Sequence, residues 1–192
     1  WKKPNSEIRN KSETRTPKCF TGEYGSANSK MNQPQQHFSL RKIEKSLADK
    51  AFPFRGRTHL GSARFAFDRA GIAAAVAMHA GNRVRTELTT ALNVSPAERR
   101  REEDPETDRF LEGFPIRVSV SDSRYAYDLN RPASRAVYTT AWGKEVWNRP
   151  LTAEEKEISL KKHAEFHRLL EIIARFLIGE NGFGIIFDFH SF

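Results

Sequence analysis

Apolar and polar residues follow two different periods along the chain, and the changes between them predict strands alternating with helices. Gly71–Met78 is a short, continuous apolar run, typical of a strand buried in a parallel sheet, although its alanines also suit a helix. Pro115–Val120 alternates apolar and polar positions, as a half-buried strand does. Gly184–Phe189 is another short apolar run. These three segments are the predicted strands of the core.

The strongest helical pattern covers Ala153–Ile178. Thr152 and Glu155 form a capping box at its start, and Gly179 and Gly182 provide a stop. Lys and Glu occupy one side, and the apolar residues lie on or near the other: Ile158, Phe166, Leu169, Leu170, Ile173 and Leu177. The pattern predicts a long amphipathic helix.

Three shorter helices are predicted from apolar residues at helical spacing and from N-cap residues. They cover Ser39–Ala51, Arg83–Leu92 and Ser95–Arg101, and Pro96 suits the first helical position of the last one. The order of strands and helices predicts right-handed crossovers and a mostly parallel sheet flanked by helices. The predicted fold class is therefore α/β.

The first third of the chain differs from the rest in composition and charge. Residues 1–36 show no period, and residues 51–61 hold a proline and two glycines, which predicts a loop. The net charge is +8, and residues 1–50, with 11 Lys/Arg and 5 Asp/Glu, carry six of these charges. We predict an irregular basic leader over residues 1–60 and one folded domain over residues 61–192.

Composition also limits the partners and the compartment. A basic leader can contact nucleic acid, but this one has few aromatic residues and no recognisable binding module, so no nucleic-acid partner is expected. The single cysteine, Cys19, excludes an internal disulfide and favours a reducing, cytoplasmic compartment. No apolar run approaches the ~18 residues of a membrane span, so no membrane partner is expected.

Polar side chains are concentrated in Asp122–Pro132, which reads DSRYAYDLNRP. On a strand, one face of this stretch would carry Tyr125, Tyr127 and Leu129. The opposite face would offer a cation, a carboxylate and an amide to a small polar ligand: Arg124, Asp128 and Asn130. The alternative interpretation is an edge strand with solvated charges and a turn at its end.

Two histidines, His79 and His190, stand where predicted strands end. Ligands of open parallel sheets bind at the carboxyl ends of the strands, so the two imidazoles can meet if their strands are neighbours. Two histidines and one carboxylate form a common catalytic zinc set, and a nearby acidic cluster offers Glu103 or Asp104. A structural, hydrogen-bonded role for either histidine is the alternative.

The sequence gives weaker support to other metal-ligating or catalytic residues. His163 and His167 lie at i and i+4 on the long helix, but among charged residues, which favours a solvated or packing role. Cys19 lies in the irregular leader and is a poor candidate nucleophile. No Ser/His/Asp order, no nucleophile elbow and no glycine-rich phosphate loop after a strand is visible in the sequence.

Five segments stand in a specific order between Ile72 and the end of the sequence. They are MHAGNRVRTEL (Met78–Leu88), EEDPETDRF (Glu102–Phe110), DSRYAYDLNRP (Asp122–Pro132), AVYTTAWGKEVWNRPLT (Ala136–Thr152) and FDFHSF (Phe187–Phe192). In this order they resemble the N-formylglutamate amidohydrolase family. They are most similar to the branch associated with flavohemoglobin expression-modulating QEGLP-motif proteins.

The resemblance implies a three-layer α/β/α sandwich similar to that of the zinc carboxypeptidases, and a hydrolase that holds one Zn²⁺. His79 and His190 would match the first and the last zinc histidine. Carboxypeptidases carry a glutamate ligand three residues after the first histidine, but this chain has Asn82 there. The remaining ligand is therefore expected from Glu103 or Asp104.

The resemblance also implies roles for the polar stretch. Asn130 and Arg131 look like the pair by which carboxypeptidases hold the terminal carboxylate of a substrate. Arg124 could hold a second carboxylate, and Asp128 could orient a zinc histidine or an arginine. Glu103 or Asp128 would move the proton. Because related hydrolases keep their general base beyond the second histidine, the domain is expected to be incomplete at its C-terminus.

The predicted function is metal-assisted hydrolysis of a small acidic N-acyl amino acid, similar to N-formylglutamate, which would give formate and glutamate. The alternative is a non-catalytic binding module that holds a small carboxylate ligand or a peptide C-terminus in the same pocket. A bound metal together with hydrolysis distinguishes the enzyme from the binding module.

Overall fold

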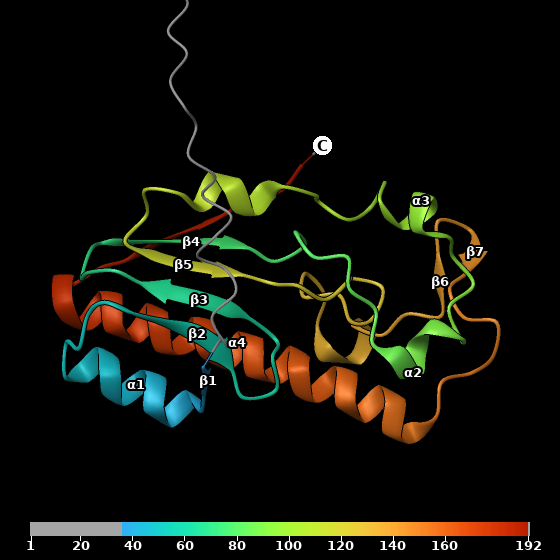
Figure 1. Ribbon diagram of the computed structural model, residues 1–192, viewed down its shortest axis with the longest axis horizontal. Coiled ribbons are helices and arrows are strands. Elements are labelled where there is room, and N and C mark those ends of the chain that lie inside the picture. Colours follow the sequence, from blue (N-terminus) through green and yellow to red (C-terminus); the bar gives the residue numbers. More distant parts are fainter. Residues whose placement is uncertain (1–35, 192) are drawn as a thin grey trace, which may run out of the picture. The chain divides into compact units, whose positions relative to one another are not determined.

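A six-stranded mixed sheet forms the centre of the computed structural model, which describes residues 36–191 (Figure 1). The strands lie in the order β1-β2-β3-β5-β4-β8. Their bounds are β1 His37–Phe38, β2 Phe54–Thr58, β3 Arg64–Phe67, β4 Ala73–Ala77, β5 Ile116–Ser119 and β8 Ile185–Asp188. Only β3 among these six runs against the others, since it is antiparallel to both neighbours and the remaining pairs are parallel. The predicted α/β class with a mostly parallel sheet is confirmed.

Helices α1 (Leu40–Ala48) and α4 (Ala153–Asn181) lie side by side along one face of the sheet (Figure 1). On the other face, the 3₁₀ helix η2 (Thr107–Leu111) packs against β4 and β5. Its Leu111 is buried with two alanines of β4. The zinc carboxypeptidase-like sandwich stays a prediction, because the second face carries the short η2 where that fold has a helical layer.

Short elements gather beyond the carboxyl ends of β4 and β5 (Figure 1). They are α2 Thr86–Thr89, α3 Pro96–Arg99, the 3₁₀ helix η3 Ala133–Arg135, and the β6 Thr140–Ala141 and β7 Lys144–Glu145 pair. Ser95 and Glu98 form a capping box at the start of α3, where a helix was predicted. The helix predicted over Arg83–Leu92 is reduced to α2. This end of the sheet is therefore built largely from loops.

Helix α4 forms for the reasons read from its sequence. Thr152 and Glu155 make the capping box, and Gly182 ends the helix with a positive φ of 76°. The helix continues through Gly179, one turn further than predicted. Phe166, Ile173 and other residues of its apolar face are fully buried against the sheet. No helix within residues 36–191 is both long and apolar enough to cross a membrane.

Residues 51–61, predicted to be a loop, contain strand β2. The ring of Phe54 stacks on Phe67 of β3, with ring centroids 4.7 Å apart, and this packing outweighs the local effect of Gly56 and Pro53. Elements β1, α1 and β2 thus join the central sheet and its helical layer ahead of residue 60. Residues 1–35 of the predicted leader, including Cys19, lie outside the described residues, so an irregular leader there stays a prediction.

The strand expected over Asp122–Pro132 is not formed, and this expectation is wrong. The segment consists of turns, apart from an isolated bridge between Asp122 and Arg83. Tyr125 and Tyr127 are nevertheless buried, as predicted, but so is Asp128. A strand would have placed Asp128 opposite the tyrosines. The turns instead bury the tyrosines and Asp128 together. Burial of Asp128 is possible because its carboxylate accepts hydrogen bonds from His79 and Arg124.

Candidate metal centre and arginine-lined cavity

The sheet topology brings His79 and His190 together. Strand β8 lies beside β4 in parallel, with Val76 opposite Asp188, so the residues that follow both strands leave the same edge of the sheet. The two imidazole rings have their centroids 5.2 Å apart. The loop before η2 adds Asp104, whose backbone N–H donates to the carbonyl oxygen of His79 at 3.0 Å.

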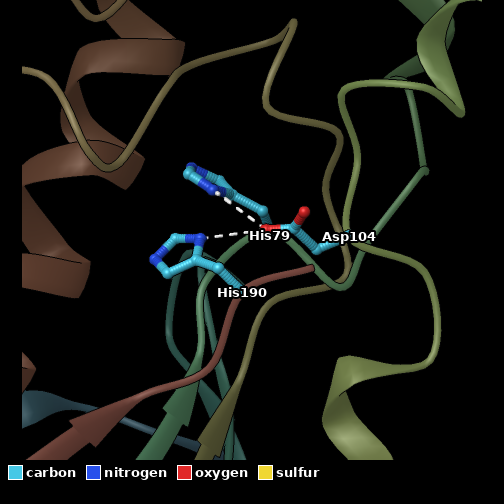
Figure 2. Close-up of side chains that lie close together, drawn as sticks. All are labelled: His79, Asp104 and His190. Atoms are coloured by element: carbon cyan, nitrogen blue, oxygen red, sulfur yellow. Dashed lines mark hydrogen bonds and ion pairs between the residues drawn. The ribbon is translucent and has the colours of Figure 1, made fainter. Parts of the chain in front are cut away.

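These three side chains form a compact group of possible metal ligands (Figure 2). The Nδ1 atom of His190 lies 2.9 Å from Oδ2 of Asp104, and the Nδ1 atom of His79 lies 3.7 Å from the same oxygen. One ligand atom from each residue lies within 4.8 Å of the other two. His79, Asp104 and His190 could therefore hold a metal ion.

The ring of His79 fits such a role. Its Nε2 atom lies 3.0 Å from Oδ1 of Asp128. Because an ionised carboxylate can only accept, Nε2–H of His79 donates this hydrogen bond. The Nδ1 atom then carries a lone pair. This atom is buried and has no hydrogen-bond partner among the described residues. A buried nitrogen without a hydrogen-bond partner lowers the stability of the fold. A metal ion bound to this lone pair would remove that cost.

Asp188 orients His190 in the same way that Asp128 orients His79. The Nε2 atom of His190 lies 2.7 Å from Oδ2 of Asp188. Burial lowers the pKa of His190, but the hydrogen bonds to Asp188 and Asp104 outweigh burial and raise it overall. Asp188 was not among the predicted site residues. The signal was its position two residues before His190, which places both side chains on one face of an extended segment.

Glu103 is directed away from this group. Its Oε1 atom accepts hydrogen bonds from Ser123 Oγ and from Arg99 Nη1, the latter at 2.9 Å. Of the two acidic residues offered by the sequence, the structure brings Asp104 to the histidines. Glu103 is buried, and its bonds connect the loop that carries Asp104 to the Asp122–Pro132 segment.

Asp128 is the centre of a buried hydrogen-bond network. Besides His79, its carboxylate accepts bonds from Nη2 of Arg124 at 2.8 Å, the backbone N–H of Asn130 at 2.9 Å and Nε of Arg131 at 3.3 Å. Burial alone would raise the pKa of Asp128, but the bonds from His79 and Arg124 outweigh burial and hold the pKa far below its ordinary value. The carboxylate therefore stays ionised and keeps these donors in place.

A cavity of about 300 Å³ lies beside this network. All three predicted substrate-binding residues line it, together with residues of the network and of η3: Arg124, Asp128, Asn130, Arg131, Pro132 and Arg135. Asp128 lines the cavity and also bonds to Nε2 of His79, so one carboxylate links the cavity wall to a residue of the candidate metal centre.

His163 and His167 have a packing role, one of the two interpretations favoured by the sequence. The Nε2 atom of His163 donates to the backbone carbonyl of Arg131 at 2.8 Å. The ring centroids of His163 and His167 are 4.4 Å apart. Burial, followed by the neighbouring His163, lowers the pKa of His167. The pair thus supports the loop that carries the arginine.

Asp122 anchors the same loop to α4, and it was not among the predicted site residues. The Nζ atom of Lys162 donates to its Oδ2 at 2.6 Å, and the hydroxyl of Tyr127 donates to the same oxygen at 2.8 Å. Arg83 donates to Oδ1 through Nε and Nη2, at 2.9 and 2.7 Å. Asp122 and Lys162 are both buried, so the polar side of α4 is not wholly solvated.

Gly81 permits a close approach between the His79 loop and the chain after β5. A Cβ atom built on Gly81 would overlap the backbone of Ser121. We expect Gly81→Ala to lower the free energy of unfolding by about 1–3 kcal/mol, because the backbone must move apart. Urea denaturation would measure this. As a control, Gly179→Ala on α4 meets no atom within 4 Å and should be neutral or stabilising by up to about 1 kcal/mol. Equal stability of Gly81→Ala and the wild type would contradict the close approach.

The fold and the site together define an α/β protein with a candidate metal centre beside an arginine-lined cavity. The family model for N-formylglutamate amidohydrolase matches residues 75–192, from β4 onward, and the chain belongs to this family. The predicted family is thereby confirmed, and it supports an amidohydrolase-like activity on a small amino acid derivative. A comparison with curated proteins gave no match, and a comparison with solved structures gave none either.

Proposed function

We propose that this protein is a zinc-dependent amidohydrolase that cleaves the amide of a small N-acyl amino acid similar to N-formylglutamate. The observation that carries the proposal is the buried Nδ1 atom of His79, which lacks a hydrogen-bond partner among the described residues and faces Asp104. The family match supports amide hydrolysis, and the arginine-lined cavity supports an acidic substrate.

His79, Asp104 and His190 would hold one zinc ion. Bound there, zinc would supply a Lewis acid that polarises the amide carbonyl and lowers the pKa of water. Asp128 and Asp188 fix the orientation of the two rings through Nε2, so that both Nδ1 atoms face Asp104. Such orienting carboxylates typically strengthen metal binding 10- to 100-fold.

Arg131 and Asn130 would bind the carboxylate of the substrate. The guanidinium of Arg131 lies over the ring of Tyr138, 5.0 Å from its centroid, and its Nε donates to Asp128. Its Nη atoms make no hydrogen bond with another described residue and are available for a carboxylate. Binding would hold the amide bond beside the metal centre, where water adds to the acyl carbon and the C–N bond breaks to release formate and glutamate.

We assign positioning roles to Asp128 and Glu103. Asp128 was predicted to orient a histidine or an arginine or to move a proton, and its contacts with His79, Arg124 and Arg131 support orientation. Its depressed pKa makes it a poor proton acceptor. Glu103 bonds to Arg99 and Ser123 and would hold the loop of Asp104. The cytoplasmic location and the lack of a nucleic-acid partner stay predictions.

We expect the purified chain to contain about one zinc ion and to hydrolyse N-formylglutamate. A chelator should remove both the metal and the activity, and added zinc should restore them, because the metal would carry the polarising charge. Metal analysis and an assay of released formate would measure this.

The same experiment separates the two functions that the sequence left open. Zinc binding with ligand binding but without hydrolysis would support a binding module. Full hydrolysis after complete removal of metal would contradict the proposed zinc dependence. Addition of magnesium instead of zinc serves as a control, because the histidine ligands favour zinc.

A further inference from the structure

The three arginines that line the cavity are not equivalent. Arg124, to which the sequence analysis assigned a second substrate carboxylate, already has partners. Its Nη1 donates to the backbone carbonyl of Glu102 at 2.8 Å and its Nη2 donates to Asp128 at 2.8 Å. The pKa of Arg124 is raised, since the bonds to Asp128 outweigh the effect of burial. Arg124 is thus part of the framework of the site.

Arg135 stands in a different position. It is the last residue of η3, and its backbone N–H donates to the carbonyl of Pro132 at 2.8 Å. This turn follows Arg131 directly and places both arginines on the wall of one cavity. The side chain of Arg135 is exposed and makes no hydrogen bond or ion pair with another described residue. Two cations with available donors therefore line one cavity.

Two guanidinium groups on one small cavity suit a ligand with two carboxylates. An arginine fork binds a carboxylate through two parallel hydrogen bonds. The carboxylate of Asp128 is shared among His79, Arg124 and Arg131, so its single negative charge does not balance the arginines of the cavity. Arg135 makes no bond to it. A volume of about 300 Å³ is at the small end of ligand sites, which suits a short diacid.

We propose that Arg135 binds the second carboxylate of a dicarboxylic substrate, while Arg131 and Asn130 bind the first. This inference rests on the proposed function, and it makes Arg135 the residue that selects N-acyl derivatives of acidic amino acids over neutral ones. Arg124 does not bind substrate in this proposal; it holds Asp128 in position through its hydrogen bond.

N-acetylglutamate and N-acetylglutamine test the proposal, because they differ only in one carboxylate. Calorimetric titration of the full chain should show N-acetylglutamate binding about 10- to 100-fold more tightly. Arg135→Gln should abolish this preference, whereas affinity for N-acetylglutamine should change less than about threefold. Arg135→Lys should retain part of the preference, because it keeps the charge but loses the fork. Arg41→Gln is the control for net charge, because Arg41 is an exposed residue of α1.

The outcomes distinguish this inference from the proposed function. A preference that depends on Arg135, in a protein that hydrolyses neither these compounds nor N-formylglutamate, would support the subsite and contradict the enzyme. Hydrolysis with equal affinities in the wild type, or a preference retained in Arg135→Gln, would overturn the subsite and leave the enzyme intact. Absence of binding of either compound to the wild type would also overturn the subsite.

Discussion

Replacing His79 or His190 by alanine should remove the bound zinc and lower amide hydrolysis by at least about 10³-fold. The metal would supply several kcal/mol of transition-state stabilisation, and two ligands cannot keep it in place. The two histidines follow the neighbouring strands β4 and β8, and their ring centroids are 5.2 Å apart, so each variant removes one side of the group. Metal content and kcat/KM, measured on the same preparations, would check the result.

His59→Ala is the matched control for these two variants. His59 is exposed in the turn between β2 and β3, so its replacement should leave metal content and activity unchanged. Circular dichroism of each variant would show that the fold is retained. If His79→Ala and His190→Ala bind zinc as the wild type does, the metal centre lies elsewhere and the proposed function is wrong.

Asp122→Ala should lower the free energy of unfolding by about 3–5 kcal/mol. The variant leaves Lys162 and the hydroxyl of Tyr127 without the carboxylate that accepts their hydrogen bonds. Lys162 is buried, and removal of one partner from a buried ion pair exposes the full desolvation cost of the other. Urea denaturation at pH 7 would measure the loss. Lys161→Ala is the control, because this neighbour is 61% exposed and its one ion pair within residues 36–191 is with Glu157.

A double variant tests the cause of the Asp122 effect. Because Asp122→Ala leaves an unpaired buried ammonium, adding Lys162→Met should recover part of the lost stability. Additive losses in the double variant would show that the pair is not coupled, and would contradict the interpretation.

The pH dependence of the Asp122 effect has a defined sign. Burial would raise the pKa of this carboxyl, but the bonds from Lys162 and Arg83 outweigh burial and lower it. A carboxyl with a lowered folded pKa contributes stability above its unfolded pKa of about 4 and loses it as the pH falls through the folded value. The difference between the wild type and Asp122→Ala should therefore narrow below about pH 4.

The elements with a strong local pattern were predicted correctly. The apolar run of Gly71–Met78 became β4, and the capped amphipathic pattern became α4, with Gly182 at its end. These predictions succeeded because a buried strand or helix needs its apolar residues at a fixed spacing. Strand β2 was missed, since Gly56 and Pro53 suggest a loop and only the stacking of Phe54 on Phe67 reveals a strand.

The sequence could not decide which of Glu103 and Asp104 lies beside the two histidines. The two residues are adjacent and chemically equivalent, so no pattern separates them. The path of the loop turns Asp104 toward His190 and Glu103 toward Arg99 and Ser123. Arg124 is a similar case: the sequence suggested it for a second substrate carboxylate, and its contacts with Asp128 and the backbone carbonyl of Glu102 show that it is already engaged.

By itself the sequence determined the α/β class, the family and the two histidines at strand ends, because each depends on residues close together along the chain. The tertiary structure alone decided that β4 and β8 are neighbours, that Asp188 orients His190, and that Lys162 is buried against Asp122. Strand pairing and the burial of a charge depend on groups far apart in sequence. Their positions follow from packing, which no local pattern records.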